Sequence, residues 1–237
     1  MQILPGLTST KRERIGAFIA DLRRSDERLI ALFPTCLDKG ERRELYRELE
    51  SIPGLGIPHV HARADCDLEE MRYLERTFGT EAFNIHPRRS GHPFAADLDG
   101  LAGRVFIENV EVPVEDAELV PESPAGGPAF GGLCPDFSHL ENARLHDRGA
   151  YVETTMRQLG RFPIGCCHLS ALRVGVPNAW SGEWDHHAFA ALTDFDYLAA
   201  YRRFFPASWA SLELENSFSE QLEARAYIVA LPAGGGD

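Results

Sequence analysis

Histidines and acidic residues recur at one kind of position in this sequence, at or just after the end of a short apolar run. His61 ends the run IPHVH, His86 follows FNI, and Glu108 ends VFIE. Later runs carry CPDFSH, CCHLS with the following WDHH, and LELEN. The complete set is His61, His86, Glu108, Asp136, His139, His168, Asp185, His187 and Glu215. Imidazole and carboxylate groups are ligands of Zn²⁺ and Mn²⁺, so the set predicts a site for roughly one to three divalent ions per chain.

Three of the carboxylates stand in or beside runs that are apolar enough to be buried. An unpaired carboxylate is costly to bury, so Glu108, Asp136 and Glu215 need cations nearby. The chain has only two lysines, Lys11 and Lys39. Arginines are available at positions 63, 88, 89 and 173, but the converging histidines favour metal ions as the counter-charge. We therefore interpret the set as metal ligands.

The last run contains two glutamates, and we expect one of them to point toward the other ligands. We choose Glu215 over Glu213, because Asn216 follows Glu215 as Asn109 follows Glu108. The adjacent thiols Cys166 and Cys167 are expected to fill core space, one facing inward and one outward.

The ligands are carried by eight apolar runs, from QILPGLTS to WASLELEN, with amphipathic helix-like stretches between most of them. This alternation predicts a parallel sheet with helical crossovers. Eight units in about 240 residues match a (β/α)₈ TIM barrel, whose strands present their carboxyl ends on one rim. We predict one barrel domain over residues 1–237, with a frayed tail at 232–237. A doubly wound open sheet is the rival fold, but no GxGxxG follows the first run.

Two local features refine this prediction. Segment 111–130 is rich in proline and glycine, so an irregular or single-turn connection is expected there in place of a full helix. Asp67 and Glu70 have the spacing of a capping box, which predicts that a helix begins just after Asp67.

Composition excludes several classes of protein. The 237 residues carry a net charge of −12, which disfavours tight binding to a phosphate backbone. No apolar run reaches the length of a membrane helix and the N-terminal sequence lacks a signal-peptide core, so we expect no membrane association. Five cysteines without CxxC spacing favour reduced thiols and a cytoplasmic location.

Six short motifs, taken in chain order, resemble the ligand pattern of the xylose isomerase-like TIM barrels. They are N-x-H-P, I-E-N, D-x-x-H, H, D-x-H and E. Within these barrels the pattern is most similar to endonuclease IV, AP endonuclease family 2. The resemblance covers nearly the whole chain but consists of short motifs. For single-metal isomerases and epimerases it implies a metal held by the matches of Glu108, Asp136, His168 and Glu215. There the two glutamates also act as acid and base, and the match of His139 touches substrate.

In the endonuclease IV branch, the resemblance implies that nine residues hold three zinc ions. The matches of His61, His86, His139, Asp185 and His187 are then ligands as well. In that arrangement Glu108 bridges two ions, and Glu215 binds metal and orients the attacking hydroxide. The additional ligands favour a multi-metal phosphoester hydrolase. The alternatives are a single-metal sugar or sugar-phosphate isomerase or epimerase, and a barrel that binds a metabolite without turnover.

The substrate is expected to be a small molecule: a sugar, a sugar phosphate or another phosphoester. The loops after Cys36 and His61 are short and contain no aromatic residue that could wedge between bases, which together with the charge disfavours duplex DNA. Arg88 and Arg89 are candidates for contacting a phosphate, although the favoured interpretation is an ordinary solvent-exposed pair. Trp180 and Trp184 are candidates for a lid over the substrate, or for packing their loop on the barrel. An oligomer is compatible with the sequence.

Overall fold

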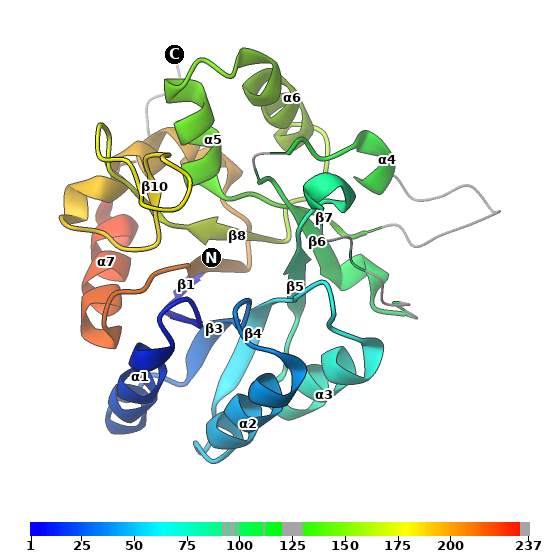
Figure 1. Cartoon of the computed structure of the whole chain (residues 1–237), viewed down its shortest axis with the longest axis vertical. Helices are drawn as coiled ribbons and strands as arrows, with labels where there is room; N and C mark the ends of the chain where they lie inside the picture. The colour runs from blue at the N-terminus through cyan, green and yellow to red at the C-terminus, as the bar shows by residue number, and fades with distance from the viewer. Residues whose placement is uncertain (92–93, 95–97, 99, 111, 120–129, 233–237) are drawn as a thin grey trace.

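The computed structural model describes residues 1–91, 94, 98, 100–110, 112–119 and 130–232. The chain has an α/β fold in which the strands lie toward the centre and helices surround them (Figure 1). One parallel sheet has six strands in the order β2-β3-β4-β5-β6-β7, and a second has three in the order β1-β11-β8. The α/β class and the parallel sheet predicted from the sequence are therefore confirmed.

Each of the eight apolar runs contains a strand. The six-stranded sheet consists of β2 (Gly6–Thr8), β3 (Leu29–Phe33), β4 (Gly56–His61), β5 (Ala82–Ile85), β6 (Val105–Glu108) and β7 (Gly132–Cys134). The three-stranded sheet consists of β1 (Gln2–Leu4), β11 (Trp209–Leu212) and β8 (Cys166–Leu169). A short antiparallel pair follows β8, formed by β9 (Ala171–Leu172) and β10 (Asp185–His186).

Contacts join the two sheets at both of their edges. At one edge, β1 runs through Pro5 into β2, and the Pro5 carbonyl accepts a hydrogen bond from Ala31 of β3 at 2.9 Å. At the other edge, parallel bridges pair Leu133 with Ile164 and Asp136 with His168. This arrangement is compatible with a TIM barrel.

Helices connect most of the strands. They are α1 (Arg12–Arg24), α2 (Lys39–Glu50), α3 (Leu68–Phe78), α4 (Asp116–Leu119), α5 (Phe137–Leu145), α6 (Gly149–Leu159) and α7 (Phe218–Ala230), with 3₁₀ turns η1 (Arg88–Ser90) and η2 (Ala102–Arg104) and the 3₁₀ helix η3 (Leu192–Phe204). The four-residue α4 is the single-turn connection expected within segment 111–130; residues 111 and 120–129 lie outside the described part. None of the described helices is long and apolar enough to cross a lipid bilayer.

The start of α3 shows how local signals and tertiary packing combine. Asp67 caps the helix by accepting a hydrogen bond from the Glu70 backbone N–H at 2.9 Å, as predicted. The Glu70 carboxylate is buried and accepts instead from Arg42 of α2 at 2.6 Å and from Tyr46 at 2.8 Å. A buried carboxylate requires such partners, so this cluster fixes α2 against α3.

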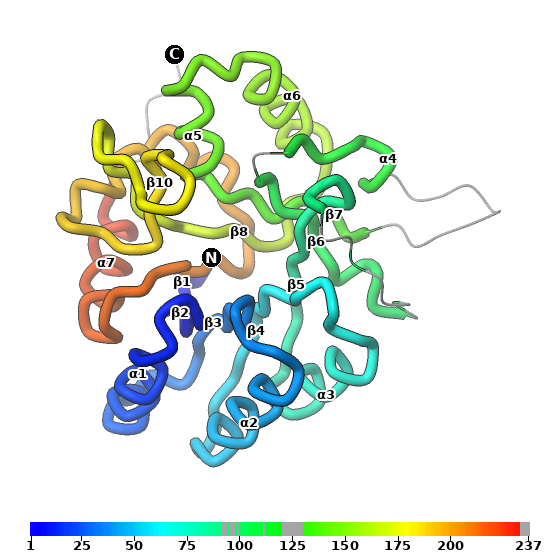
Figure 2. Tube along the Cα trace, in the orientation of Figure 1, coloured from blue at the N-terminus to red at the C-terminus, as the bar shows by residue number. Residues whose placement is uncertain are grey.

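The first and last parts of the chain lie side by side. Strand β1 pairs in parallel with β11, and helix α1 lies beside α7 (Figure 2). Phe18 of α1 packs edge-on against Phe218 of α7 with ring centroids 5.1 Å apart. The neighbours Cys166 and Cys167 are both buried but belong to different apolar clusters, Cys166 with Ala82 and Cys134 and Cys167 with the main core. This confirms that the two thiols face opposite ways. Of the tail predicted to fray, residues 233–237 lie outside the described part.

Candidate metal centre

The carboxyl ends of the strands bring five of the nine predicted ligands, His61, His86, Glu108, His139 and His187, to the walls of one pocket of about 460 Å³. Its walls include His61 from β4, His86 after β5, Glu108 from β6, and His139 from the first turn of α5. Thr35, Ser90, Val110, Val112, His187 and Glu213 complete the walls. We refer to His61, His86, Glu108, Asp136, His139, His168, Asp185 and Glu213 as the candidate metal centre.

Glu108 lies in the middle of the centre and is only 2% exposed. Its Oε2 is 3.6 Å from His61 Nε2 and 3.9 Å from His86 Nε2. Its Oε1 is 3.4 Å from His168 Nδ1 and 3.9 Å from His139 Nε2. Two ligands that each lie about 2.1 Å from one ion are themselves about 3–4 Å apart. The spacing on both sides of the carboxylate is therefore that of ligands around an ion.

A second group of potential ligands surrounds His168, whose side chain is fully buried. Its Nδ1 lies 3.1 Å from Glu213 Oε2 and 4.0 Å from Asp136 Oδ2. The ligand atoms of Glu108, Asp136, His168 and Glu213 all lie within 4.8 Å of one another. The same holds for His61, His86 and Glu108, so Glu108 belongs to both groups.

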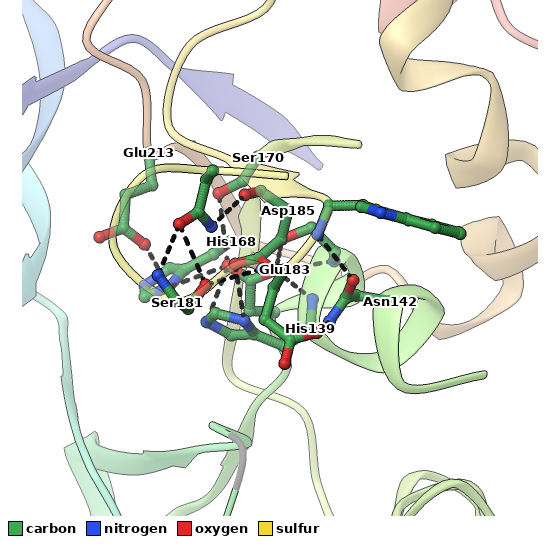
Figure 3. A network of polar contacts seen from close by, with 12 residues as sticks. His139, Asn142, His168, Ser170, Ser181, Glu183, Asp185 and Glu213 are labelled. Carbon is green, nitrogen blue, oxygen red and sulfur yellow. Dashed lines mark hydrogen bonds and ion pairs between the residues drawn. The ribbon is translucent and has the colours of Figure 1, made fainter. Parts of the chain in front are cut away.

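His139 and Asp185 form a pair at the edge of this centre, with His139 Nδ1 3.2 Å from Asp185 Oδ2 (Figure 3). Asp185 comes from β10, and the loop before it is tied to α5. Asn142 of α5 donates a hydrogen bond to the Glu183 carboxylate at 2.6 Å and accepts one from the Trp184 backbone N–H at 2.9 Å. These bonds position Asp185, which holds Nδ1 of His139 while Nε2 faces Glu108 and Asp136.

Glu213 occupies the place that the sequence analysis assigned to Glu215. Glu213 is 6% exposed and contacts His168, whereas Glu215 is absent from the ligand groups found among the described residues. Strand β11 ends at Leu212, and the chain then turns away. The Glu215 N–H donates to the His187 carbonyl at 2.5 Å, and the Glu215 carbonyl accepts from Arg14 of α1 at 2.6 Å. Among the described residues, Glu213 and not Glu215 therefore lies beside the other ligand candidates.

The substrate-contacting residues suggested by the sequence lie away from this pocket. Arg89 pairs with Glu115 at 2.5 Å, and the Arg88 guanidinium lies 5.8 Å above the Phe130 ring. Trp184 packs against His146 with ring centroids 4.5 Å apart, and Trp180 is 96% exposed. Thus Trp184 anchors its loop to α5, and none of these four residues is brought into the described walls of the pocket.

The ionisation of the centre is governed by burial and by the carboxylates. Burial lowers the pKa of His61 to about 3, and the nearby Glu108 charge offsets this only in part. For His139, burial also lowers the pKa, but Asp136 and Asp185 outweigh it and raise the pKa to about 10. Burial raises the pKa of Glu213, but His187 and His168 outweigh it and bring the pKa to about 2.

The donor set fits a divalent cation. Among the described residues, the ion pairs of Glu108, Asp136 and Glu213 are all with histidines and none is with lysine or arginine. His61 Nδ1 and both ring nitrogens of His168 are buried without a well-aligned hydrogen bond. Buried polar atoms are normally satisfied. A bound ion would give a partner to His168 Nδ1, which faces Glu108 and Glu213, and would neutralise the carboxylates.

Two further groups among the described residues also have their potential ligand atoms within 4.8 Å of one another: His61, His168 and Glu213, and, apart from the candidate metal centre, His59, Cys134 and Cys166. Both ring nitrogens of His59 are already engaged: Nδ1 lies 2.6 Å from Ser211 Oγ and Nε2 lies 3.0 Å from Asn84 Oδ1. His59 therefore has no free nitrogen for an ion. The sequence analysis did not select His59, although it stands two residues before His61 and so shares the same face of β4.

The ion-free protein is expected to be most stable near pH 6.5. The pKa of His61 is about 3 in the folded protein, against the ordinary histidine value of 6.5, which we take for the unfolded chain. Between these values only the unfolded chain binds the proton, so stability rises with pH. The pKa of His139 is about 10 when folded against the same reference. The contribution of His139 to the free energy of unfolding is therefore fully present below pH 6.5 and is lost as pH rises toward 10. Calorimetry of chelator-treated protein should show Tm falling by ~5 °C or more on each side of the optimum.

Two substitutions assign the two sides of this profile. His139→Gln is expected to reduce the loss of stability on the alkaline side, where the raised pKa of His168 also contributes. His61→Gln is expected to reduce the loss as pH falls from 6.5 to 4.5, below which the lowered pKa of Glu213 also contributes. A Tm that continues to rise between pH 7 and 9 in the chelator-treated wild type would contradict the assignment of a raised pKa to His139.

The chain was compared with protein-family models and with curated proteins, and neither comparison found a match, so the resemblance in ligand pattern is carried by the residues of the centre alone.

Proposed function

We propose that the chain is a divalent-metal-dependent phosphoester hydrolase built on a (β/α)₈ barrel of the xylose isomerase-like class. Barrel closure is inferred from the contacts between the two sheets, where β1 continues into β2 and residues 133 and 136 bridge to 164 and 168. With β1 and β2 counted as one interrupted strand, the two sheets would supply eight barrel strands, whose carboxyl ends share the rim where active sites of such barrels lie.

The observation that carries the proposal is the position of the Glu108 carboxylate between two pairs of histidines. Oε2 faces His61 and His86, while Oε1 faces His139 and His168. A carboxylate that offers each oxygen to a different set of ligands is suited to bridging two ions. A single-metal site needs neither His61 nor His86, so their presence favours a centre with more than one ion.

We infer that His61, His86 and Glu108 would hold one ion, and that Glu108, Asp136, His168 and Glu213 would hold another. Bound Zn²⁺ or Mn²⁺ ions would supply an activated hydroxide at neutral pH and neutralise charge on phosphoryl oxygens. Asp185 holds the Nδ1 side of His139, which directs Nε2 into the centre, as carboxylate partners of ligand histidines do. Glu213 lines the pocket, and as an ionised carboxylate it would accept a hydrogen bond from the attacking water and so orient it.

The pocket suits a small substrate. Its volume of about 460 Å³ lies in the range of sites that bind small molecules. The net charge of −12 opposes the approach of a long phosphate backbone. We therefore propose a small phosphorylated or sugar-containing substrate and not duplex DNA.

A single-metal sugar or sugar-phosphate isomerase or epimerase is the second candidate. It is supported by the group of Glu108, Asp136, His168 and Glu213, which alone suffices for one ion. In that reaction two carboxylates would move a proton between adjacent carbons of a substrate held on one Lewis-acid ion.

Metal stoichiometry distinguishes the two candidates. Protein purified without chelator is expected to contain two or three Zn²⁺ or Mn²⁺ ions per chain by elemental analysis, and to hydrolyse para-nitrophenyl phosphate mono- or diesters. One ion per chain, together with solvent deuterium appearing at a sugar carbon in a panel of aldoses and ketoses, would replace the hydrolase by the isomerase. No bound ion after reconstitution with Zn²⁺ or Mn²⁺ would overturn both.

A further inference from the structure

A chain of buried hydrogen bonds leads from the barrel interior to Glu108. Ser211 Oγ lies 2.6 Å from His59 Nδ1, and His59 Nε2 lies 3.0 Å from Asn84 Oδ1. Asn84 Nδ2 in turn donates to Glu108 Oε2 at 2.7 Å. Ser211, His59 and Asn84 are all fully buried, so solvent does not compete for these bonds. The chain joins β11, β4, β5 and β6 beneath the candidate metal centre.

The hydrogen-bond requirements fix the direction of this chain. An ionised carboxylate only accepts hydrogen bonds, so the amide nitrogen of Asn84 must face Glu108 and its oxygen must face His59. His59 Nε2 must then carry a proton. In a neutral ring, Nδ1 is an acceptor and takes the hydroxyl proton of Ser211. Reversing the Asn84 amide would place its oxygen against the carboxylate. Only one orientation of the amide therefore satisfies every hydrogen bond in the chain.

We propose that Asn84 and His59 are positioning residues that hold Glu108 in the bridging orientation. The inference rests on the proposed multi-metal function and deepens it. The Asn84 N–H occupies one lone pair of Oε2 and leaves the other directed toward His61 and His86. Without that bond the carboxylate can rotate about its last side-chain torsion, which is intrinsically soft. Rotation would move both carboxylate oxygens away from their neighbouring histidines. It would disrupt both ligand groups at once, because each group uses a different oxygen of the same carboxylate.

The arrangement differs from ordinary filling of the core. A fully buried amide and imidazole cost free energy unless each polar atom is satisfied, and apolar side chains would fill the same space without that cost. The neighbouring carboxylate is the only charged group in the chain of bonds, and a hydrogen bond to a charged group is about twice as strong as one between neutral groups.

The proposal is tested by titrating Mn²⁺ into the ion-free protein and recording electron paramagnetic resonance spectra. The wild type is expected to give the spectrum of an exchange-coupled pair. Asn84→Leu keeps the volume and removes the hydrogen bonds, so the second Mn²⁺ is expected to bind about 10- to 100-fold more weakly, with loss of the coupled spectrum. His59→Phe removes the hydrogen bond that holds Asn84, so it is also expected to weaken binding of the second Mn²⁺ and to reduce the coupled spectrum. His59→Gln presents an amide N–H in place of Nε2–H and is expected to restore the coupling.

Matched controls separate positioning from folding. Gln158→Leu removes another buried amide, which donates to the Val114 carbonyl and to Asp116 at 2.9 Å and contacts no residue of the candidate metal centre through these bonds. It is expected to lower Tm without changing the Mn²⁺ spectrum. If Asn84→Leu does not fold, the test is the comparison of the Mn²⁺ spectra of His59→Phe and His59→Gln. Unchanged coupling in Asn84→Leu, or in His59→Phe, would overturn the positioning role. A wild type that binds only one ion would instead overturn the proposed function.

Discussion

Glu108→Gln is expected to abolish the paired metal site and to lower phosphoester hydrolysis by ~10³-fold or more. Two bound ions would contribute several kcal/mol of charge stabilisation, and each 1.4 kcal/mol is about tenfold in rate. Glutamine offers one acceptor oxygen and one NH₂ group, so one pair of histidines would face an N–H in place of a ligand. Because Glu108 Oε2 faces His61 and His86 while Oε1 faces His139 and His168, either orientation of the amide loses one ion.

Elemental analysis after dialysis is the primary measurement, since it needs no knowledge of the natural substrate. Glu141→Gln is the matched control: Glu141 is also buried, but it accepts hydrogen bonds from Arg144 at 2.8 Å and Tyr201 at 2.7 Å and is not in a ligand group. It is expected to keep the wild-type ion content. A Glu108→Gln protein with an undiminished ion content would show that Glu108 does not bridge.

Most of the site residues that could be predicted from the sequence lie at the carboxyl ends of parallel strands. His61, His86, Glu108 and His168 stand at or next to the ends of four parallel strands, and the carboxyl ends of such strands meet at one edge. Their convergence therefore follows from strand order without any knowledge of loops. The positions of the strands themselves could be predicted because each apolar run is bounded by polar or turn-forming residues.

Loop residues could not be placed in this way. Arg89 reaches Glu115 and Trp184 reaches His146, and each partner lies in a different segment whose path depends on tertiary packing. Asp185 is the exception, because the antiparallel pair of β9 and β10 returns it to the site. The sequence contains no local signal for the Asn142–Glu183 bond that ties this loop to α5.

The choice between Glu213 and Glu215 depended on where the last strand ends. Residues two apart on a strand share a face, so alternation places Ser211, Glu213 and Glu215 on the same side and cannot separate the two glutamates. Ser211 of β11 reaches the buried His59 of β4, and Glu213 continues that face. Beyond Leu214, whose carbonyl accepts from Gln221 of α7 at 3.0 Å, the chain bends toward the helices. A tertiary contact thus removes Glu215 from the site.

Substitution of these two glutamates is therefore expected to give opposite results. Glu213→Gln removes a charge that lies 3.1 Å from His168 Nδ1 and is expected to weaken Zn²⁺ binding by about 100-fold or more, a loss of about 3 kcal/mol. Glu215→Gln changes a side chain that lines a separate pocket with Lys11 and Arg14, so the affinity is expected to stay within about twofold of wild type. Competition with a chromogenic chelator measures both constants.

The comparison is informative because the two variants make the same chemical change two positions apart. Loss of negative charge by itself lowers the attraction of the whole molecule for cations, and this effect is equal in both variants. The difference between them therefore reports contact with the ion and not net charge. Strong weakening in Glu215→Gln with normal binding in Glu213→Gln would require the chain beyond Leu212 to run differently, with the Glu215 N–H released from the His187 carbonyl. Equal weakening in both would assign the effect to long-range electrostatics and remove Glu213 from the ligand set.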